Sequence, residues 1–404
     1  MKKIDPKVDE AIQRLNMQDG PTRRRLLAGT GLVSATAAAS ALLAACSSSS
    51  TASATSSASG STSSSAAAGA IGNFPSTPPW QFWFVNHVTT NLFFVPTQFG
   101  MADAAALLGL PKPKWGGSQS SIPSEMVSYI NTAIGAKADG IATTVINSSP
   151  SDTTFTTPVA AAMNAGIPVV SYNADGPIIN GVATPGTNRL CYVGQALYLS
   201  GQQMGERIKS LAKPGEIAIC IATPGSANIQ PRLDGATSVL TKAGYTVKMV
   251  PTGATTADEG TAEKAFLLGN SSKITGAFAV DAGSTELLGP QLAGVGLTGK
   301  IPAGGFDLTP GTLTAIQNGQ LDFTINQQPY LQGFLPVLYL YLFNLTGGLV
   351  PPPDTDTGLT FVTRSSVGPY ISSTTTYEGS TGASKPTLVP RSGPIQNTLA
   401  TTST

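Results

Sequence analysis

The 404-residue sequence contains few of the side chains that most enzymes and metalloproteins use, with one histidine and three cysteines. Apart from Cys46 near the N-terminus, the soft metal ligands are Cys191, Cys220 and His87, and no two of them have the close spacing of a structural zinc site. A Ser-His-Asp arrangement would have to use His87, and the sequence has no GxSxG motif. We therefore expect a protein that is not an enzyme and holds no metal or other cofactor.

The cysteines leave one question open. Cys220 lies in an apolar run that predicts a strand, where a buried and unreactive thiol is expected. A disulfide between Cys191 and Cys220 is compatible with a location outside the cytoplasm, and their spacing does not decide whether they pair.

Charged residues are also scarce, at 11% of the sequence. Seven of the 23 basic and four of the 22 acidic residues lie in residues 1–45, which leaves 16 and 18 in the remainder. This near-neutral balance argues against nucleic acid as a partner. The length is sufficient for two domains with sizeable cores.

Residues 1–46 have the pattern of an export signal. Thr22–Leu27 contains three consecutive arginines and resembles a twin-arginine signal, and an Ala- and Leu-rich run follows. Leu43–Cys46 resembles a lipoprotein processing site, which would make Cys46 the acylated N-terminus of the mature chain. An uncleaved membrane anchor is the alternative, but the glycines and serines of this run disfavour a spanning helix. Residues 47–78 are rich in Ser, Thr and Ala and predict a disordered tether.

A glycine-rich motif at Gly294–Lys300 satisfies GxGxxG and nearly satisfies the Walker pattern. Both uses need a strand before the glycines and a helix after them, so that helix amides face the phosphates. Here a helix is expected before the glycines and a strand after them. We therefore interpret the motif as the glycine-rich end of a helix.

Strand and helix patterns alternate along the folded part, which predicts α/β architecture with mostly parallel sheets. The pattern restarts near Tyr192. Helices expected in the second half include 261–268 and 286–292. From 366 to 404 the chain is rich in Ser and Thr and predicts a poorly ordered tail.

A short pattern occurs once in each half of the chain. Ile167–Asn173 and Ile301–Asp307 both begin with Ile-Pro, carry an aromatic residue next to last, and end in Asn or Asp. Two similar lobes that point polar strand ends into a shared cleft would produce this repeat, whereas chance similarity is the alternative. The next expected strand, Leu321–Asn326, ends just before Gln327, which places Gln327 at the same sheet edge. This edge, at the carboxyl ends of parallel strands, is where ligands bind.

From about Pro79 to Thr363 the sequence resembles the type I periplasmic sugar-binding proteins, the ribose-binding-like receptors of ABC importers. Asn91–Val95 is similar to the NPFF loop of that family, with Leu92 in place of proline, and Pro231–Gly235 matches its R-x-x-G motif. Ser171–Asp175 falls where ribose binders carry an Asp-Arg pair. Asn173 and Ala174 replace both members of that pair, which argues against ribose itself. The resemblance implies ligand contacts from His87, Asn91, Phe93, Phe94, Asn173, Asp175, Arg232, Asp281, Asp307 and Gln327.

The chemistry of this set suits a sugar, whose C–H faces stack on aromatic rings and whose hydroxyls both donate and accept hydrogen bonds. Structural roles remain open for several members. One of Phe93 and Phe94 is equally well explained as core, and Asn173 or Gln327 as a cap or turn former. For His87 we prefer, narrowly, a histidine with satisfied hydrogen bonds at a strand end.

The resemblance implies two Rossmann-like lobes with parallel sheets joined by a three-segment hinge, the type I periplasmic binding protein fold. The lobes are expected at 79–192 plus 328–352 and at 193–327 plus 353–365. The implied function is capture of a small sugar or polyol outside the cytoplasm for an ABC permease, by a monomer held at the cell envelope through lipid. The alternative is a chemoreceptor or autoinducer-type signal-binding protein that presents its ligand to a membrane sensor. Which sugar is bound is not decided by the sequence.

Overall fold

The computed structural model describes residues 75–146, 152–176, 186–253 and 255–372, together with the backbone of two short strands, β5 (Ile178–Ile179) and β6 (Val182–Ala183). The predicted export signal, the lipidation of Cys46, the tether up to residue 74 and the tail after residue 372 lie outside the described residues. Among the helices that are described, none is both long and apolar enough to cross a bilayer.

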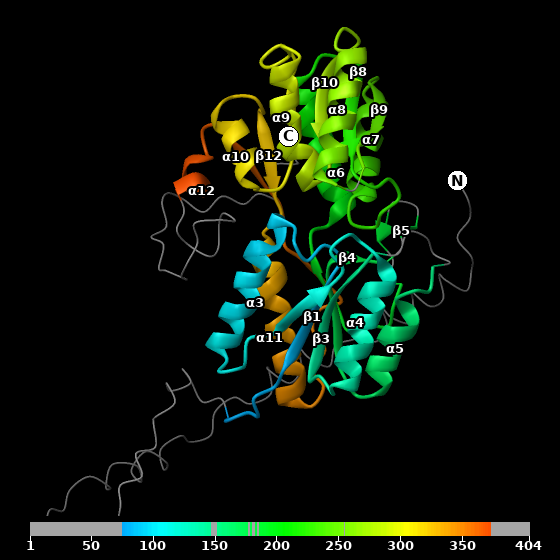
Figure 1. The fold of residues 1–404 in the computed structure, drawn as a ribbon, viewed down its shortest axis with the longest axis vertical. Helices are drawn as coiled ribbons and strands as arrows, with labels where there is room; N and C mark the ends of the chain where they lie inside the picture. Colours follow the sequence, from blue (N-terminus) through cyan, green and yellow to red (C-terminus); the bar gives the residue numbers. More distant parts are fainter. Residues whose placement is uncertain are drawn as a thin grey trace, which may run out of the picture. The chain divides into compact units, whose positions relative to one another are not determined.

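The described residues form two lobes, each built around a six-stranded sheet (Figure 1). All strand pairs of the first sheet are parallel, and its order is β13-β7-β4-β3-β1-β2. Its strands are β1 (Phe82–Asn86), β2 (Lys114–Gly117), β3 (Gly140–Val145), β4 (Val169–Asp175), β7 (Tyr192–Gly194) and β13 (Asp354–Asp356).

The second sheet has the order β14-β12-β11-β10-β8-β9, and only the pair of β12 with β14 is antiparallel. Its strands are β8 (Glu216–Ile221), β9 (Thr246–Pro251), β10 (Ile274–Ala279), β11 (Ala303–Phe306), β12 (Phe323–Asn326) and β14 (Thr360–Thr363).

Helices cover both faces of each sheet, so the central strands are apolar on both sides. In the first lobe, Phe82 and Phe84 of β1 pack toward α3 and α11, whereas Trp83 and Val85 pack toward α4 and α5. Figure 1 shows α11, in orange, beside α3, in cyan, although more than 200 residues separate them in sequence. The helical segments of this lobe are η1 (Leu92–Phe94), α3 (Val95–Leu107), α4 (Pro123–Gly135), α5 (Thr156–Asn164) and α11 (Pro329–Thr346).

The second lobe repeats this alternation on β8. Ile217, Ile219 and Ile221 pack toward α6 and α7, and Ala218 and Cys220 pack on the opposite face toward α8, α9 and α10. The helices of this lobe are α6 (Leu197–Leu211), α7 (Gln230–Lys242), α8 (Thr256–Asn270), α9 (Ala282–Gly294), α10 (Pro310–Gln317) and α12 (Gly368–Ser372).

Two helices begin earlier than the sequence pattern predicted, at Thr256 and Ala282. In each case the residue before the helix caps it: the side chain of Thr255 accepts a hydrogen bond from the Asp258 amide, and that of Asp281 from the Ser284 amide. The added first turns are polar and carry no apolar periodicity, which is why the sequence did not indicate them.

Both cysteines of the folded part are free and buried, so the open disulfide question is answered: they do not pair. Cys191 belongs to the core of the first lobe and Cys220 to that of the second. Burial raises the pKa of the Cys191 thiol to about 12 and that of Cys220 well above its usual value, so both are unreactive thiols.

The chain crosses between the lobes three times, through Gln195–Ala196, Gln327–Gln328 and Thr357–Leu359. Two of the expected boundaries are wrong by a few residues, because β7 and β13 both belong to the first sheet. The sequence of β13, Asp-Thr-Asp, is polar and short, as suits a sheet edge, and therefore gave no strand signal.

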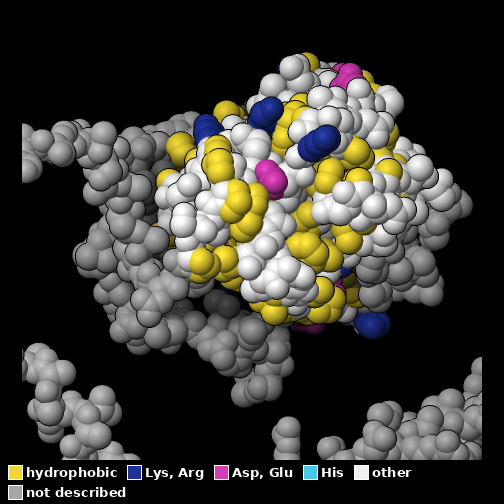
Figure 2. Space-filling view, turned by 90° about the horizontal axis from the view of Figure 1, so that it is seen from below, with side chains coloured by type: hydrophobic (Ala, Val, Ile, Leu, Met, Phe, Trp, Pro, Cys, Tyr) yellow, Lys and Arg dark blue, Asp and Glu magenta, His cyan; other side chains and the backbone are white. Residues whose placement is uncertain are grey.

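The third crossover is hydrogen-bonded to each of the other two. The side-chain amide of Gln195 donates to the Gly358 carbonyl over 3.3 Å, and the Thr357 hydroxyl donates to the Gln327 carbonyl over 2.8 Å. The side-chain amide of Gln328 donates to the Thr357 carbonyl. Figure 2 shows hydrophobic side chains scattered over the displayed face of the molecule, among few Lys, Arg, Asp or Glu.

Candidate functional site

A cavity of about 120 Å³ lies between the two lobes, at the carboxyl ends of their strands. Its walls contain nine of the ten side chains that the sequence assigned to ligand binding. They are His87, Asn91, Phe93, Phe94, Asn173, Arg232, Asp281, Asp307 and Gln327.

The two Ile-Pro repeats end on the same backbone feature. Asn173 and Asp307 have φ values of 63° and 80°, in the left-handed region that residues other than glycine seldom adopt. The backbone of Asp307 is fixed there, because its amide donates to the Ile325 carbonyl and its carbonyl accepts from the Thr324 hydroxyl over 2.7 Å. This turn at the end of β11 places the carboxylate in the cavity wall.

The second lobe supplies the charged part of the wall. Arg232 of α7 is buried, its guanidinium lies 4.3 Å from the centre of the Phe306 ring, and Nη1 donates to the Val280 carbonyl over 3.0 Å. Its Nε is buried without a hydrogen-bond partner. Burial raises the pKa of Asp307 to about 6, although the charge of Arg232 and a 2.7 Å hydrogen bond from Gln327 Nε2 act in the opposite direction.

The first lobe supplies an aromatic wall. The Phe94 ring meets those of Phe93 and His87 edge to face, with centroids 4.7 and 5.4 Å apart. Both phenylalanines line the cavity and both belong to the buried cluster of the first lobe, which also includes Ala282 of the second. Asn91 lines the cavity as well, but its Oδ1 accepts a hydrogen bond from the Phe93 amide and caps η1.

His87 makes a hydrogen bond to each lobe. Its Nε2 lies 3.3 Å from Asn228 Nδ2 of the second lobe, and its Nδ1 lies 3.2 Å from the Thr144 hydroxyl of the first. Because an amide nitrogen only donates, Nε2 accepts and Nδ1 carries the proton, which is the neutral form. Burial lowers the pKa of His87 to about 4, in agreement with this form. The expectation of a satisfied histidine therefore holds, and the ring also lines the cavity.

A chain of amides connects the two strand ends. Asn173 Nδ2 donates to Gln332 Oε1 over 3.1 Å, and Gln332 Nε2 lies 3.2 Å from both the carbonyl and the Oε1 of Gln327. Gln327 in turn donates to Asp307. Gln332 of α11 was not singled out from the sequence, because nothing in an apolar helix marks a glutamine as facing the hinge.

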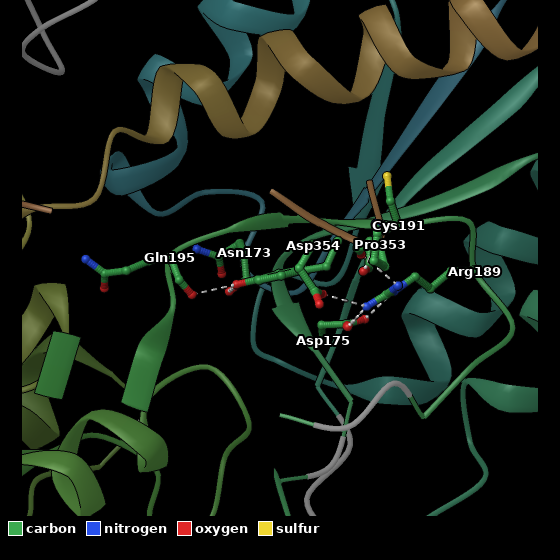
Figure 3. A network of polar contacts seen from close by, with 9 residues as sticks. Asn173, Asp175, Arg189, Cys191, Gln195, Pro353 and Asp354 are labelled. Carbon is green, nitrogen blue, oxygen red and sulfur yellow. Dashed lines mark hydrogen bonds and ion pairs between the residues drawn. The ribbon is translucent and has the colours of Figure 1, made fainter. Parts of the chain in front are cut away.

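Asp175 lies outside the cavity, so the structure gives no support to its predicted contact with a ligand. It forms a buried ion pair with Arg189, as Figure 3 shows. Arg189 Nη1 also donates to the Pro353 carbonyl over 3.1 Å, and Nη2 lies 3.4 Å from Asp354 Oδ1 (Figure 3). The pair therefore connects the end of β4 to β13 beside the third crossover.

Sequence reasoning missed several other residues of the cavity wall, among them Asn228 and Glu259. Asn228 lies in the turn before α7 and has no motif of its own. Glu259 lies in the first turn of α8, where an acidic residue is ordinarily explained by the helix dipole.

A family model described as the periplasmic binding protein domain matches residues 82–343. The chain is 46% identical over 326 residues to the xylose/arabinose-binding protein XylF of Sulfolobus acidocaldarius, which covers 78% of this chain and 79% of the relative.

Solved structures agree with these matches. A solute-binding protein of an ABC transporter from Burkholderia graminis, in complex with D-arabinose, is 25% identical with a TM-score of 0.65, over 74% of this chain and 99% of that one. A carbohydrate transporter protein from Acidothermus cellulolyticus, in complex with myo-inositol, is 26% identical with a TM-score of 0.62, over 73% and 97%. The predicted fold of two α/β lobes with mostly parallel sheets is confirmed.

Proposed function

Because the chain belongs to the periplasmic binding protein family, as a type I sugar-binding protein, we propose that it captures a monosaccharide in the interlobe cavity and delivers it to the permease of an ABC transporter. The family is extracytoplasmic and non-enzymatic, as the sequence predicted. The observation that carries the proposal is the cavity itself, with an aromatic wall from one lobe and a charged, hydrogen-bonding wall from the other.

The size of the cavity suits one sugar ring. A volume of 120 Å³ is well below the about 300–1,000 Å³ of pockets that hold drug-sized ligands, so the cavity favours a monosaccharide over an oligosaccharide.

The polar atoms of the wall suit sugar hydroxyls. The Asp307 carboxylate accepts, the buried and unpartnered Nε of Arg232 donates, and the amides of Asn173 and Gln327 offer both. Phe93 and Phe94 form a hydrophobic surface against which the C–H face of a sugar would stack. Charge-assisted hydrogen bonds in such a site contribute about 1.5–3 kcal/mol each.

The class of sugar we propose is a pentose. The name of the 46% identical relative gives xylose and arabinose as its ligands. The replacement of an Asp-Arg pair by Asn173 and Ala174 argues against ribose. Calorimetric titration with xylose, arabinose, ribose, glucose and myo-inositol tests this order, and tight binding of none of them would overturn the proposal.

Delivery to a permease is tested in the cell. Deleting the chain should abolish high-affinity uptake of the bound pentose, and re-expression should restore it. If uptake is unchanged while binding in vitro is tight, the protein serves as a signal receptor rather than in transport.

We also propose that Cys46 is acylated and tethers the protein to the membrane, on the evidence of the lipobox-like Leu43–Cys46 and the Ser/Thr-rich residues after it. Replacing Cys46 with Ala should abolish acylation and leave an unprocessed or mislocalised chain. Mass spectrometry of the N-terminal peptide distinguishes the two forms. A Cys46→Ala variant that is processed and acylated like the parent would refute the assignment.

A further inference from the structure

Glu259 is a carboxyl group of the cavity wall to which neither a sequence motif nor the resemblance gives a role. It lies in the first turn of α8, is 5% exposed, and lines the cavity together with Asp281 and Gly283 of the α9 N-terminal turn. A Cβ atom at position 283 would overlap the Glu259 carboxyl group. The absence of a side chain at Gly283 is therefore what allows Glu259 to reach this position.

The charges that face Glu259 are mainly negative. Asp281 and Glu286 of α9 and Asp258 of its own helix all act on it, and Glu263 lies one turn further along α8. Arg232, the cation on the other side of Asp281, is directed toward the Val280 carbonyl and the charge of Asp307. An ionised Glu259 would thus be a buried charge next to another anion.

Burial raises the pKa of both neighbouring carboxyls, but only at Asp281 do several hydrogen bonds and the charge of Arg232 act in the opposite direction. The Asp281 oxygens accept hydrogen bonds from the amides of Ala222 and Ser284, both 2.9 Å long, and from the Ser284 hydroxyl at 3.1 Å. Glu259 lies within hydrogen-bonding reach of Asp281. Burial, followed by the charge of Asp281, raises the pKa of Glu259 to about 8, so the proton shared by this pair resides on Glu259.

The buried surroundings of Glu263, one turn further along α8, also favour a neutral carboxyl group at Glu259. Glu263 is fully buried, and apart from the weak donor thiol of Cys220 its carboxyl oxygens have no hydrogen-bond partner. Burial raises the pKa of Glu263 to about 10. The environment on this side of the cavity therefore stabilises neutral carboxylic acids rather than carboxylates.

We propose that Glu259 is a further ligand-binding residue, a neutral carboxylic acid whose O–H donates to Asp281 while its carbonyl oxygen accepts a hydrogen bond from a sugar hydroxyl, so that sugar binding is coupled to a proton. This inference rests on the proposed function and deepens it. A sugar in the cavity excludes water from Glu259 and makes its ionised form still less favourable. The bound protein therefore holds the proton to a higher pH than the free protein does.

The sign of the coupling follows from linkage. Below about pH 8 the free protein already carries the proton, and affinity is independent of this group. Above that pH each binding event takes up a proton, so affinity should fall by about tenfold per pH unit. Asp307 and His87 titrate near pH 6 and 4, outside this window.

The test is titration calorimetry of the full chain with arabinose and with xylose from pH 7 to 9.5. Buffers of different ionisation enthalpy count the protons taken up. The parent should take up close to one proton per sugar at pH 9, whereas Glu259→Gln, whose amide donates but does not titrate, should take up none and show a flat affinity profile.

Glu263→Gln is the matched control, because it changes the same group one turn away on the same helix but outside the cavity lining. It should keep the pH dependence of the parent. A flat profile for the parent with normal binding, or a slope that persists in Glu259→Gln, overturns this inference and leaves the proposed function intact. Binding of neither pentose at any pH overturns both.

Discussion

The two lobes share a fold but contribute different chemistry to the cavity between them. The first lobe provides neutral and aromatic groups, and the second provides Arg232, Glu259, Asp281 and Asp307. The two Ile-Pro repeats illustrate this difference, because one ends in an asparagine and the other in an aspartate. Asn173 and Asp307 have the same left-handed backbone, yet Asn173 is bonded to an amide of its own lobe, whereas Asp307 faces Arg232. One backbone geometry therefore serves two electrostatic roles.

This difference has an energetic consequence. Desolvating aromatic and amide groups costs little compared with desolvating ions, but bonds to ions are stronger and more directional. We therefore expect the second lobe to carry both the larger desolvation cost and the larger share of the binding free energy, and the first lobe mainly to supply the surface that covers the ligand.

The largest effect expected is on stability. It concerns Asp175, the carboxylate beside the hinge, which does not line the cavity. Asp175→Asn removes the buried counter-charge of Arg189 and leaves it only the exposed Asp354, 3.4 Å away, which should lower the free energy of unfolding by about 3 kcal/mol. Affinity for pentose should stay within threefold of the parent, because Asp175 lies outside the cavity. Urea unfolding and calorimetry measure the two quantities. A large loss of affinity with unchanged stability would restore Asp175 to the ligand-binding set.

Asp307→Asn makes the end of the second repeat resemble that of the first and should reduce affinity by about 30- to 1,000-fold, or roughly 2–4 kcal/mol. The ligand loses an acceptor, and the buried Arg232 loses a nearby counter-charge. The parent should also weaken below about pH 6 as this carboxylate takes up a proton, and the variant should not.

Asp234→Asn is the control for Asp307→Asn, since it removes the same charge from α7, two residues after Arg232 in sequence, but does not line the cavity. If calorimetry shows that Asp307→Asn binds pentose within threefold of the parent, the carboxylate charge that distinguishes the second lobe at this position is not a source of affinity.

Glu263→Gln should stabilise the protein in a pH-dependent manner. A carboxyl whose pKa is higher in the folded than in the unfolded protein makes stability fall as pH rises from the unfolded value, near 4.5, toward the folded value of about 10. The variant should match the parent at pH 4 and have the higher free energy of unfolding at pH 8, with the difference growing steadily between these two pH values. Glu206→Gln, at an exposed pair with Lys209, should change stability by less than about 0.5 kcal/mol. A Glu263→Gln variant that is less stable than the parent at pH 8 would contradict this assignment.

The smallest effect is expected for the direct hydrogen bond between the lobes. Asn228→Ala removes the donor to His87 and should weaken pentose binding by about 0.5–1.5 kcal/mol, a two- to tenfold loss. Because burial lowers the pKa of His87 to about 4, the bond is present above that pH and is lost below it, when Nε2 becomes protonated. Calorimetry at pH 7 should therefore separate parent and variant. Equal affinities there would show that this contact does not contribute to binding.

The sequence predicted those parts of the site that follow from the fold. Alternating strands and helices imply parallel sheets, and parallel strands bring their carboxyl ends to one edge, which places Asp307 and Gln327 in the cavity. Arg232 followed from its motif, and burial of a charge in such a position is difficult to explain without a partner.

Other parts depend on contacts between residues distant in sequence. Asp175 finds its partner in Arg189, on a loop whose path the sequence does not reveal. The strand β13 is formed by one threonine between two aspartates, and aspartate is rare in strands. These residues pair because β7 offers a free edge. Glu259 enters the cavity because Gly283, 24 residues later, has no side chain.

The hydrogen bonds among the three crossovers bear on how the lobes move. Three independent flexible crossovers would let one lobe twist, slide and tilt against the other. The hydrogen bonds Gln195–Gly358 and Gln328–Thr357 instead join the crossovers into a single short band, and Arg189 holds one edge of this band through its hydrogen bond to Pro353. Two rigid bodies joined by such a band retain essentially one rotation. We therefore expect the lobes to open and close by rotation about one axis. The surface that a membrane partner contacts would then change with a single quantity, the angle between the lobes at this band.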